Sequence, residues 1–253
     1  MGYPLLAILL MGKELPYGIV NTQGRVAPLE PGLQINDGKN LNINGLSSIN
    51  SQLFNIVMNR CQNVHMTRVN VLAACDSPNT DGIHVRQSSD VTILNSNIRN
   101  GDDCISIGPG TSNMWIESIT CRPGHGISLQ INDGKNLNIN GLLSSINSQL
   151  FNIVMNRCQN VHMTRVNVLA ACDSPNTDGI HVRQSSDVTI LNSNIRNGDD
   201  CISIGPGTSN MWIESITCGP RHGISIGSLG MEAEEDGVHN VTVKSSTFTG
   251  TQN

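Results

Sequence analysis

Short runs of alternating apolar and polar residues recur along the chain. Gly82-Ile-His-Val, Cys104-Ile-Ser-Ile and Gly126-Ile-Ser-Leu begin 22 residues apart, as do Val91-Thr-Ile-Leu and Asn113-Met-Trp-Ile. Asn, Asp, Ser and Gly separate these runs, which is typical of short β-strands between turns. No helical periodicity connects them, which disfavours a βαβ fold. The pattern predicts an all-β fold, a single-stranded right-handed parallel β-helix, which is a solenoid with ~22 residues per coil.

A much longer repeat overlies this period. Gln34–Leu46 recurs as Gln130–Leu142, and after one inserted leucine Ser47–Cys121 recurs unchanged as Ser144–Cys218. The distance along the sequence between the two copies is not a whole multiple of 22 residues. We therefore expect loops to absorb the difference.

The repeats are compatible with one β-helix domain over residues 1–253, with near-identical segments at 34–126 and 130–223. Each coil of a solenoid contacts only its neighbours, so additional coils extend the stack without repacking a closed core.

Composition agrees with stacked strands. The chain is 38% apolar with 25 Gly, only 3% aromatic, and contains 31 Asn. Ile, Val and Leu suit a strand core, and Asn suits the bends. The net charge of −5, without any basic run, makes nucleic acid a poor partner.

Several features concern the cellular compartment. No stretch is long enough to span a membrane. The apolar segment Tyr3–Met11 is interpreted as a buried first strand rather than a signal peptide, because a basic flank and a cleavage site are lacking. The sequon Asn240-Val-Thr242 makes secretion plausible. Eight cysteines form no C-x-x-C pair, so we expect no zinc site.

Three residues in each repeat share the strand period and carry chemistry. They are Asp81, Asp103 and His125 in the first repeat, and Asp178, Asp200 and His222 in the second. Equivalent positions on adjacent coils lie about 4.8 Å apart, so each set should form a column on one face. Asp102 and its counterpart Asp199 can join the columns only from a bend, because adjacent strand residues point to opposite faces.

Clustered carboxylates favour acid–base chemistry. They cannot all ionise easily, so at least one pKa should rise. A protonated acid beside ionised partners is suited to glycoside hydrolysis. The alternative is ordinary turn chemistry, because Asp-Gly and Gly-Asp-Asp are common bends. The shared 22-residue spacing of Asp, Asp and His favours a site.

The motifs together resemble those of the plant polygalacturonase family. Three blocks occur in the family's order and spacing: Asn79-Thr-Asp-Gly-Ile-His84, Gly101-Asp-Asp-Cys-Ile-Ser-Ile-Gly108 and Gly124-His-Gly126. Weaker similarity covers Val64–Asn70, Asp76-Ser-Pro78 and Gln23–Pro28. The main blocks recur in the second repeat, so the resemblance includes an internal tandem duplication.

The resemblance implies inverting hydrolysis of α-1,4 bonds in polygalacturonate, without metal or cofactor. Asp102 or Asp199 would protonate the leaving oxygen. Asp81 with Asp103, or Asp178 with Asp200, would activate water, and His125 or His222 would assist by hydrogen bonding. It also implies the cystines Cys104–Cys121 and Cys201–Cys218, for which buried thiols are the alternative. The expected protein is a secreted, extracellular or cell-wall monomer that acts on pectin and binds neither nucleic acid nor membrane.

The chain departs from the family pattern at three places. Ser128-Leu-Gln130 runs directly into the second repeat, and Arg221 precedes His222 where the family has a small residue. Obstruction of substrate is the preferred interpretation of Arg221, and an added cation is the alternative. The family's Arg-Ile-Lys block would follow Thr249–Asn253, so a C-terminal truncation is expected. The alternative function is an inactive or truncated homologue that at most binds pectin.

Overall fold

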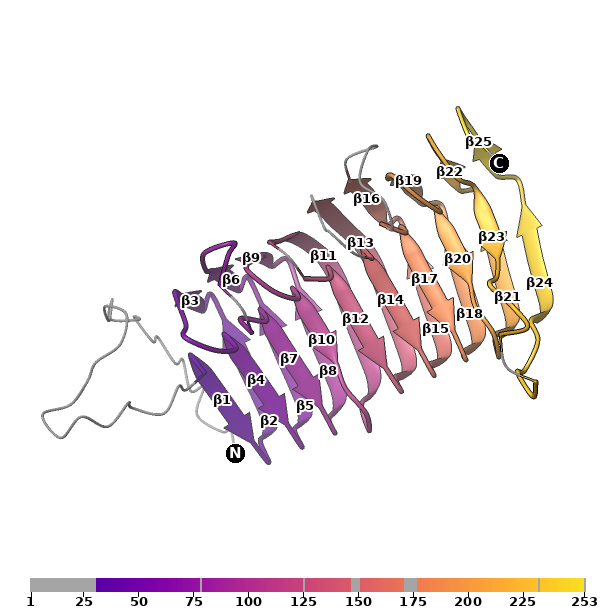
Figure 1. Ribbon diagram of the computed structural model, residues 1–253. Coiled ribbons are helices and arrows are strands. Elements are labelled where there is room, and N and C mark those ends of the chain that lie inside the picture. The colour runs from indigo at the N-terminus through magenta and orange to yellow at the C-terminus, as the bar shows by residue number, and fades with distance from the viewer. Residues whose placement is uncertain are drawn as a thin grey trace, which may run out of the picture.

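The computed structural model describes residues 31–77, 79–124, 126–146, 151–170, 177–231 and 233–252. Within these ranges the chain consists of parallel strands and contains no helix. The strands stack one coil upon the next into an elongated solenoid, from the indigo end to the yellow end (Figure 1). The predicted all-β solenoid is therefore confirmed.

One face of the solenoid is a nine-stranded parallel sheet, called sheet one here. Its strands are β1 (Leu33–Asn36), β4 (Ile56–Asn59), β7 (Ile83–Arg86), β10 (Ile105–Ile107), β12 (Leu129–Asn132), β14 (Ile153–Asn156), β17 (Ile180–Arg183), β20 (Ile202–Ile204) and β23 (Ile224–Ile226).

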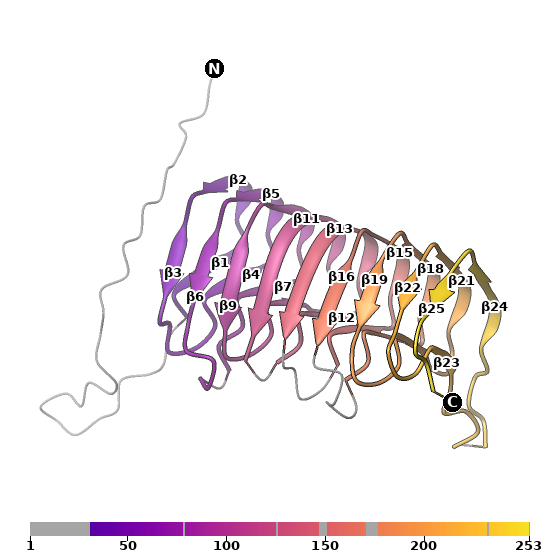
Figure 2. The same ribbon diagram turned by 90° about the horizontal axis from the view of Figure 1, so that it is seen from above.

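A second, 16-stranded sheet bends around the rest of each coil (Figure 2). Its first part contains β2 (Lys39–Asn44), β5 (Gln62–Thr67), β8 (Ser89–Leu94), β11 (Ser112–Pro123), β13 (Lys135–Ile146), β15 (Gln159–Thr164), β18 (Ser186–Leu191), β21 (Ser209–Glu214) and β24 (His239–Lys244). Its second part contains β3 (Ser47–Ile49), β6 (Asn70–Leu72), β9 (Asn97–Asn100), β16 (Asn167–Ala170), β19 (Asn194–Arg196), β22 (Thr217–Cys218) and β25 (Thr247–Phe248), together with the ends of β11 and β13.

Strand alternation sends one row of each sheet into the core. On sheet one this row includes Ile56, Ile83, Ile105, Leu129 and Ile153, each at most 1% exposed. Full burial of such a side chain contributes roughly 1.5–3 kcal/mol. The opposite row of the same strands faces outward and is free to carry polar chemistry.

The abundant asparagines form a ladder at the corner where β2 and its equivalents begin. Asn and Asp residues occupy this position in every coil with φ between 54 and 58°: Asn40, Asn63, Asp90, Asn113, Asn136, Asn160, Asp187, Asn210 and Asn240. These residue types tolerate the left-handed conformation. Neighbouring amides also bond along the stack, as where Asn63 Nδ2 donates to Asn40 Oδ1 at 2.8 Å. The composition thus reflects a repeated corner.

The coil length is not uniform: it equals the predicted ~22 residues in some coils and is longer in others. Ile83 pairs with Ile105 at that spacing, whereas Ile56 pairs with Ile83, 27 positions away, and Ile105 with Leu129, 24 positions away. Four coils separate Ile56 from Ile153. The duplication therefore adds whole coils, and loops absorb the difference, as expected.

Both cystines implied by the resemblance are present, Cys104–Cys121 and Cys201–Cys218. Among the described cysteines, Cys61, Cys75 and Cys158 are free. Some sequence-based predictions lie outside the described residues: the segment Tyr3–Met11, the block Gln23–Pro28, Pro78 and His125.

Candidate active site

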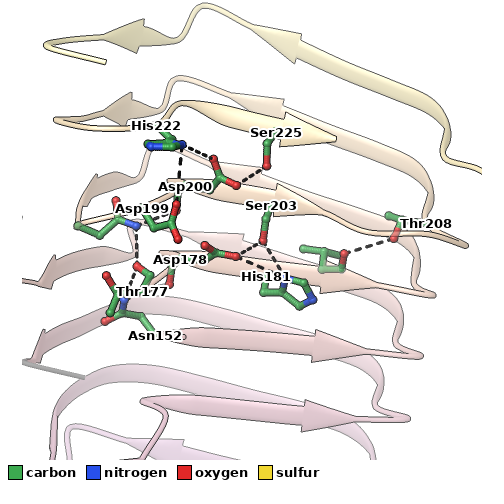
Figure 3. A network of polar contacts seen from close by, with 12 residues as sticks. Asn152, Thr177, Asp178, His181, Asp199, Asp200, Ser203, Thr208, His222 and Ser225 are labelled. Atoms are coloured by element: carbon green, nitrogen blue, oxygen red, sulfur yellow. Dashed lines mark hydrogen bonds and ion pairs between the residues drawn. The ribbon is translucent and has the colours of Figure 1, made fainter. Parts of the chain in front are cut away.

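The second acidic column lies where the coil turns into sheet one. Asp178 precedes β17, Asp199 and Asp200 precede β20, and His222 precedes β23. Because Ile180 pairs with Ile202 and Ile202 with Ile224, Asp178, Asp200 and His222 are register neighbours on successive coils. The predicted arrangement of these residues is found in the second repeat (Figure 3).

Buried amides support the turn that carries the Asp pair. Asn197 is fully buried, and its Nδ2 donates to the carbonyls of Thr177 and Asp200, each at 2.7 Å. Asn152, one coil earlier, donates to the Asp178 carbonyl at 3.0 Å. These bonds connect three successive coils directly beneath the carboxyl groups, so the backbone of the column is held from inside the core.

Two serines, which sequence reasoning missed, orient the carboxylates. Ser203 Oγ donates to Asp178 Oδ2 at 2.5 Å and also lies 2.7 Å from His181 Nδ1. Ser225 Oγ donates to Asp200 Oδ2 at 2.5 Å. Their signal was the serine of each Ile-Ser-Ile run, which occupies the outward position directly beside the column.

His181 is a further residue that the sequence analysis did not single out. Its ring lies 4.8 Å from the Phe151 ring, and its Nδ1 is 3.5 Å from Asp178 Oδ2. The predicted histidine, His222, is more exposed, and its Nδ1 lies 3.8 Å from Asp199 Oδ1 and 4.0 Å from Asp200 Oδ1. The second column therefore has a histidine at each end of the carboxylates.

Burial makes one carboxyl of the second column a weaker acid. The pKa of Asp200 is raised first by desolvation and then by the negative charges of Asp178 and Asp199, while the Ser225 hydroxyl opposes the shift. A group with a raised pKa holds its proton to higher pH. A carboxyl whose pKa is raised in this way is suited to general acid–base chemistry.

An open cleft of about 660 Å³ is lined by the carboxylates of the second column, Asp178, Asp199 and Asp200. Its wall is formed in part by Ile226, the last residue of β23, and by Gly227, Ser228 and Leu229, which follow that strand. Residues 227–238 lie between β23 and β24, whereas only residues 133–134 lie between β12 and β13, the strands at the corresponding place beside the first column. Arg221 is exposed and is not among the residues that line this cleft, so its expected effect on substrate stays a prediction.

The first acidic column starts with the same contacts between a serine, an aspartate and a histidine as the second column. Ser106 Oγ donates to Asp81 Oδ2 at 2.6 Å and lies 2.7 Å from His84 Nδ1. Burial raises the pKa of Asp103 to about 7, with smaller contributions from the charges of Asp81 and Asp102. The pKa of Asp102 is raised as well, mainly by desolvation and then by Asp81.

The first column then diverges because the register shifts by two residues. Leu129 of the second repeat, rather than Ile127, pairs with Ile105. Asp103 Oδ1 consequently accepts from the Ile127 backbone N–H at 2.7 Å. Ser128 is fully buried and lies 2.6 Å from Ser144 Oγ instead of reaching the carboxylate, as Ser225 does in the second repeat. The identical segments Ser47–Cys121 and Ser144–Cys218 thus continue into two different sites.

Both clusters have donor atoms close enough for a cation. Oxygen or nitrogen atoms of Asp199, Asp200 and His222 lie within 4.8 Å of one another, as do carboxylate oxygens of Asp81, Asp102 and Asp103. Such proximity is equally expected of carboxylates that share a proton. No independent feature of the described residues favours a metal over this acid–base role.

The described residues combine a parallel β-solenoid with a column of carboxylates in an open cleft, which defines the structural class as a β-helix protein with an acidic cleft. The sequence profile of glycosyl hydrolases family 28 matches this chain twice, over residues 20–130 and 128–253. The chain therefore belongs to glycosyl hydrolases family 28, and each repeat region carries the family's sequence pattern.

Curated relatives agree with this assignment. A polygalacturonase of Prunus persica is 58% identical over 153 residues, which are 58% of this chain and 37% of that protein. An exopolygalacturonase of Platanus acerifolia is 51% identical over 111 residues, 44% of this chain and 29% of that protein. The matches thus span less than two-fifths of these relatives' lengths.

A solved structure supports the fold. Endo-xylogalacturonan hydrolase from Aspergillus tubingensis superimposes with a TM-score of 0.54 at 17% sequence identity, covering 87% of this chain and 64% of that one. Among the described residues, no helix is long and apolar enough to cross a membrane.

Proposed function

We propose that this chain hydrolyses α-1,4-galacturonosyl bonds of pectin, with inversion, at the second column. The observation that carries the proposal is the cleft in which Asp178, Asp199 and Asp200 lie beside His222. The similarity to polygalacturonases supplies the substrate class. We also propose one β-helix domain for residues 1–253.

Each residue has a role in the proposed reaction. Asp199 protonates the leaving glycosidic oxygen, and Asp178 with Asp200 activates the attacking water. Desolvation, followed by the negative charges of Asp178 and Asp199, raises the pKa of Asp200, so this half-buried carboxyl keeps its proton to higher pH than an exposed aspartate does. His222, within 4.0 Å of both members of the pair, supports the ionised forms.

The first column is the weaker candidate of the two. Asp81, Asp102 and Asp103 supply the corresponding carboxylates, and His125 lies outside the described residues. The turn after β12 contains only residues 133–134 and lacks the long segment that forms part of the wall of the second cleft. We therefore assign the hydrolysis to the second column and expect a smaller contribution from the first.

The proposed setting is extracellular, at the plant cell wall where pectin is found. Two cystines are compatible with an oxidising compartment. Asn240 is exposed and lies in the only N-x-Ser/Thr sequon of the chain. We propose a monomer with pectin as its partner.

The proposal is tested by the release of reducing ends from polygalacturonate. The parent protein should release them, and the double variant Asp102→Asn with Asp199→Asn should lose the activity by at least about 100-fold, as expected when a general acid is removed. Circular dichroism should show the same fold for both proteins. A folded parent that binds polygalacturonate but releases nothing would contradict hydrolysis and favour the inactive pectin-binding homologue.

A further inference from the structure

Two arginines on the outer surface of sheet one lie next to the acidic columns. Arg86 ends β7 and Arg183 ends β17, and both are exposed. Each follows a histidine of its column, His84 or His181, by two residues. Because side chains two positions apart in a strand point to the same side, each arginine shares the outer face with that histidine, roughly 6.6 Å further along.

These arginines belong to one outward row that crosses all the coils. Asn59 pairs with Arg86, and Asn156 pairs with Arg183. The strand pairing, extended by one residue past the ends of β10, β20 and β23, defines the whole row. From the first coil to the last it consists of Asn36, Asn59, Arg86, Gly108, Asn132, Asn156, Arg183, Gly205 and Gly227. The row contains two cations and no acidic residue.

Neither arginine is neutralised within the described part of the chain. The arginines that form ion pairs there are Arg60, with Asp37, and Arg157, with Asp133. Arg165 instead donates to the Asn140 amide oxygen. Arg86 and Arg183 thus differ from these three in offering guanidinium donors without a protein acceptor.

Glycines leave room beside Arg183 on the side of the cleft. A Cβ added to Gly205 would lie only 3.4 Å from Arg183 Cγ, so the arginine stem runs against this glycine. The next position in the row is Gly227, which itself lines the cleft. Along this row Arg183 therefore stands two coils from Gly227, with only the glycine Gly205 between them.

We infer that Arg183 binds a carboxylate of the polygalacturonate chain lying in the second cleft, and that Arg86 binds another carboxylate of the same chain. This inference rests on the proposed function for the identity of the polymer. Guanidinium groups bind carboxylates through paired, charge-assisted hydrogen bonds. Arg183 is a specificity-determining residue in this scheme, because it distinguishes galacturonate from its uncharged methyl ester.

Two physical arguments favour one polymer for both arginines. The column contributes three carboxylates to a protein of net charge −5, so a polyanion is repelled unless local cations offset the charge. Arg86 and Arg183 stand four coils apart on one continuous face, which is about 19 Å at the spacing of sheet strands. A flexible polyanion can contact both, and the second contact then benefits from a high effective concentration.

The test measures binding rather than hydrolysis. In the double background Asp102→Asn with Asp199→Asn, which removes the proposed acid of both columns and so protects the ligand from hydrolysis, isothermal titration would compare this background protein, the parent of the test, with the same protein carrying Arg183→Gln or Arg86→Gln. Arg165→Gln is the matched control, because it removes the same charge from a turn outside sheet one. The ligands are digalacturonate, a long unesterified oligogalacturonate and its fully methyl-esterified counterpart.

Arg183→Gln should weaken binding of the long unesterified ligand about tenfold, the usual worth of a charge-assisted bond. It should leave the esterified ligand unaffected. Arg86→Gln should weaken binding of the long ligand and not of digalacturonate, which is too short to reach both arginines. Arg165→Gln should bind like the parent.

Equal binding by Arg183→Gln and the parent would overturn the inference, as would an equal loss in Arg165→Gln, or no binding by the parent. The long ligand could bind with the expected dependence on the two arginines while the wild-type chain hydrolyses nothing. That result would support the inference and contradict the proposed function. The two claims therefore fail separately.

Discussion

Asp103→Asn should stabilise the folded protein at alkaline pH and leave it nearly unchanged at acidic pH. The Asp103 carboxyl is only 7% exposed, and burial raises its pKa from 3.8 to about 7. Since the folded-state pKa lies above the unfolded value, the group's contribution to stability is fully present below about pH 4 and is lost as the pH rises through 7. Full ionisation of Asp103 therefore destabilises the folded protein by about 4 kcal/mol, and asparagine, which does not ionise, avoids this destabilisation.

The assay is the difference in urea-unfolding free energy between the variant and its parent, at about pH 3.5 and about pH 8.5. Asparagine retains an oxygen that can accept from the Ile127 N–H, so the two proteins should differ by less than about 1 kcal/mol at the lower pH. At the higher pH the variant should be more stable by up to about 4 kcal/mol.

A control with the opposite sign is Asp133→Asn. Its ion pair with Arg157 lowers the pKa of Asp133, so its contribution is present at neutral pH and lost in acid. This variant should be slightly less stable than the parent at the higher pH, by at most about 1 kcal/mol for such a surface pair. A stability difference for Asp103→Asn that does not change with pH would refute the argument.

Two further predictions concern the second column. Ser225→Ala should move the acidic limb of the kcat/KM profile for polygalacturonate to higher pH, because the serine hydroxyl lowers the pKa of Asp200; an unchanged limb would contradict this contact. Gly179→Ala should destabilise the fold by about 1–3 kcal/mol in thermal unfolding, since the added Cβ would lie 2.6 Å from the Cys201 carbonyl oxygen. Gly237→Ala, with nothing within 4 Å, should be neutral and is the control.

The fold was predictable because its strongest signal is local and repeated. Alternation within each short run, as at Ile83–Arg86, specifies the inward row, and the chain repeats that row coil after coil. The lengths of the turns were not predictable in this way. A coil of 27 positions and one of 22 contain equally regular strands, since the additional residues lie in the turns and leave the core row unchanged.

The carboxylates of the site were also predictable, whereas their orientation was not. Ser128 and Ser225 follow the same Gly-Ile dipeptide, yet Ser128 is buried against Ser144 and Ser225 reaches Asp200. The residues that follow decide the outcome, because pairing of Leu129 with Ile105 shifts the strand by two positions in the first repeat. Local sequence contains no signal for such a shift, which depends on what the next coil pairs with.

The arginine row illustrates a similar limit. Arg86 and Arg183 look like ordinary exposed strand ends in the sequence. Their relation to the cleft follows from the register, which places Gly205 and Gly227 beside Arg183. Only the stacking of coils brings these separate segments into one row.

The most direct test of the account compares Asp199→Asn with Asp102→Asn in initial rates of reducing-end release from polygalacturonate. The account assigns the chemistry to the second column, so Asp199→Asn should lose at least about 100-fold and Asp102→Asn should keep most of the activity. An equal loss in both variants, or a loss confined to Asp102→Asn, would contradict it.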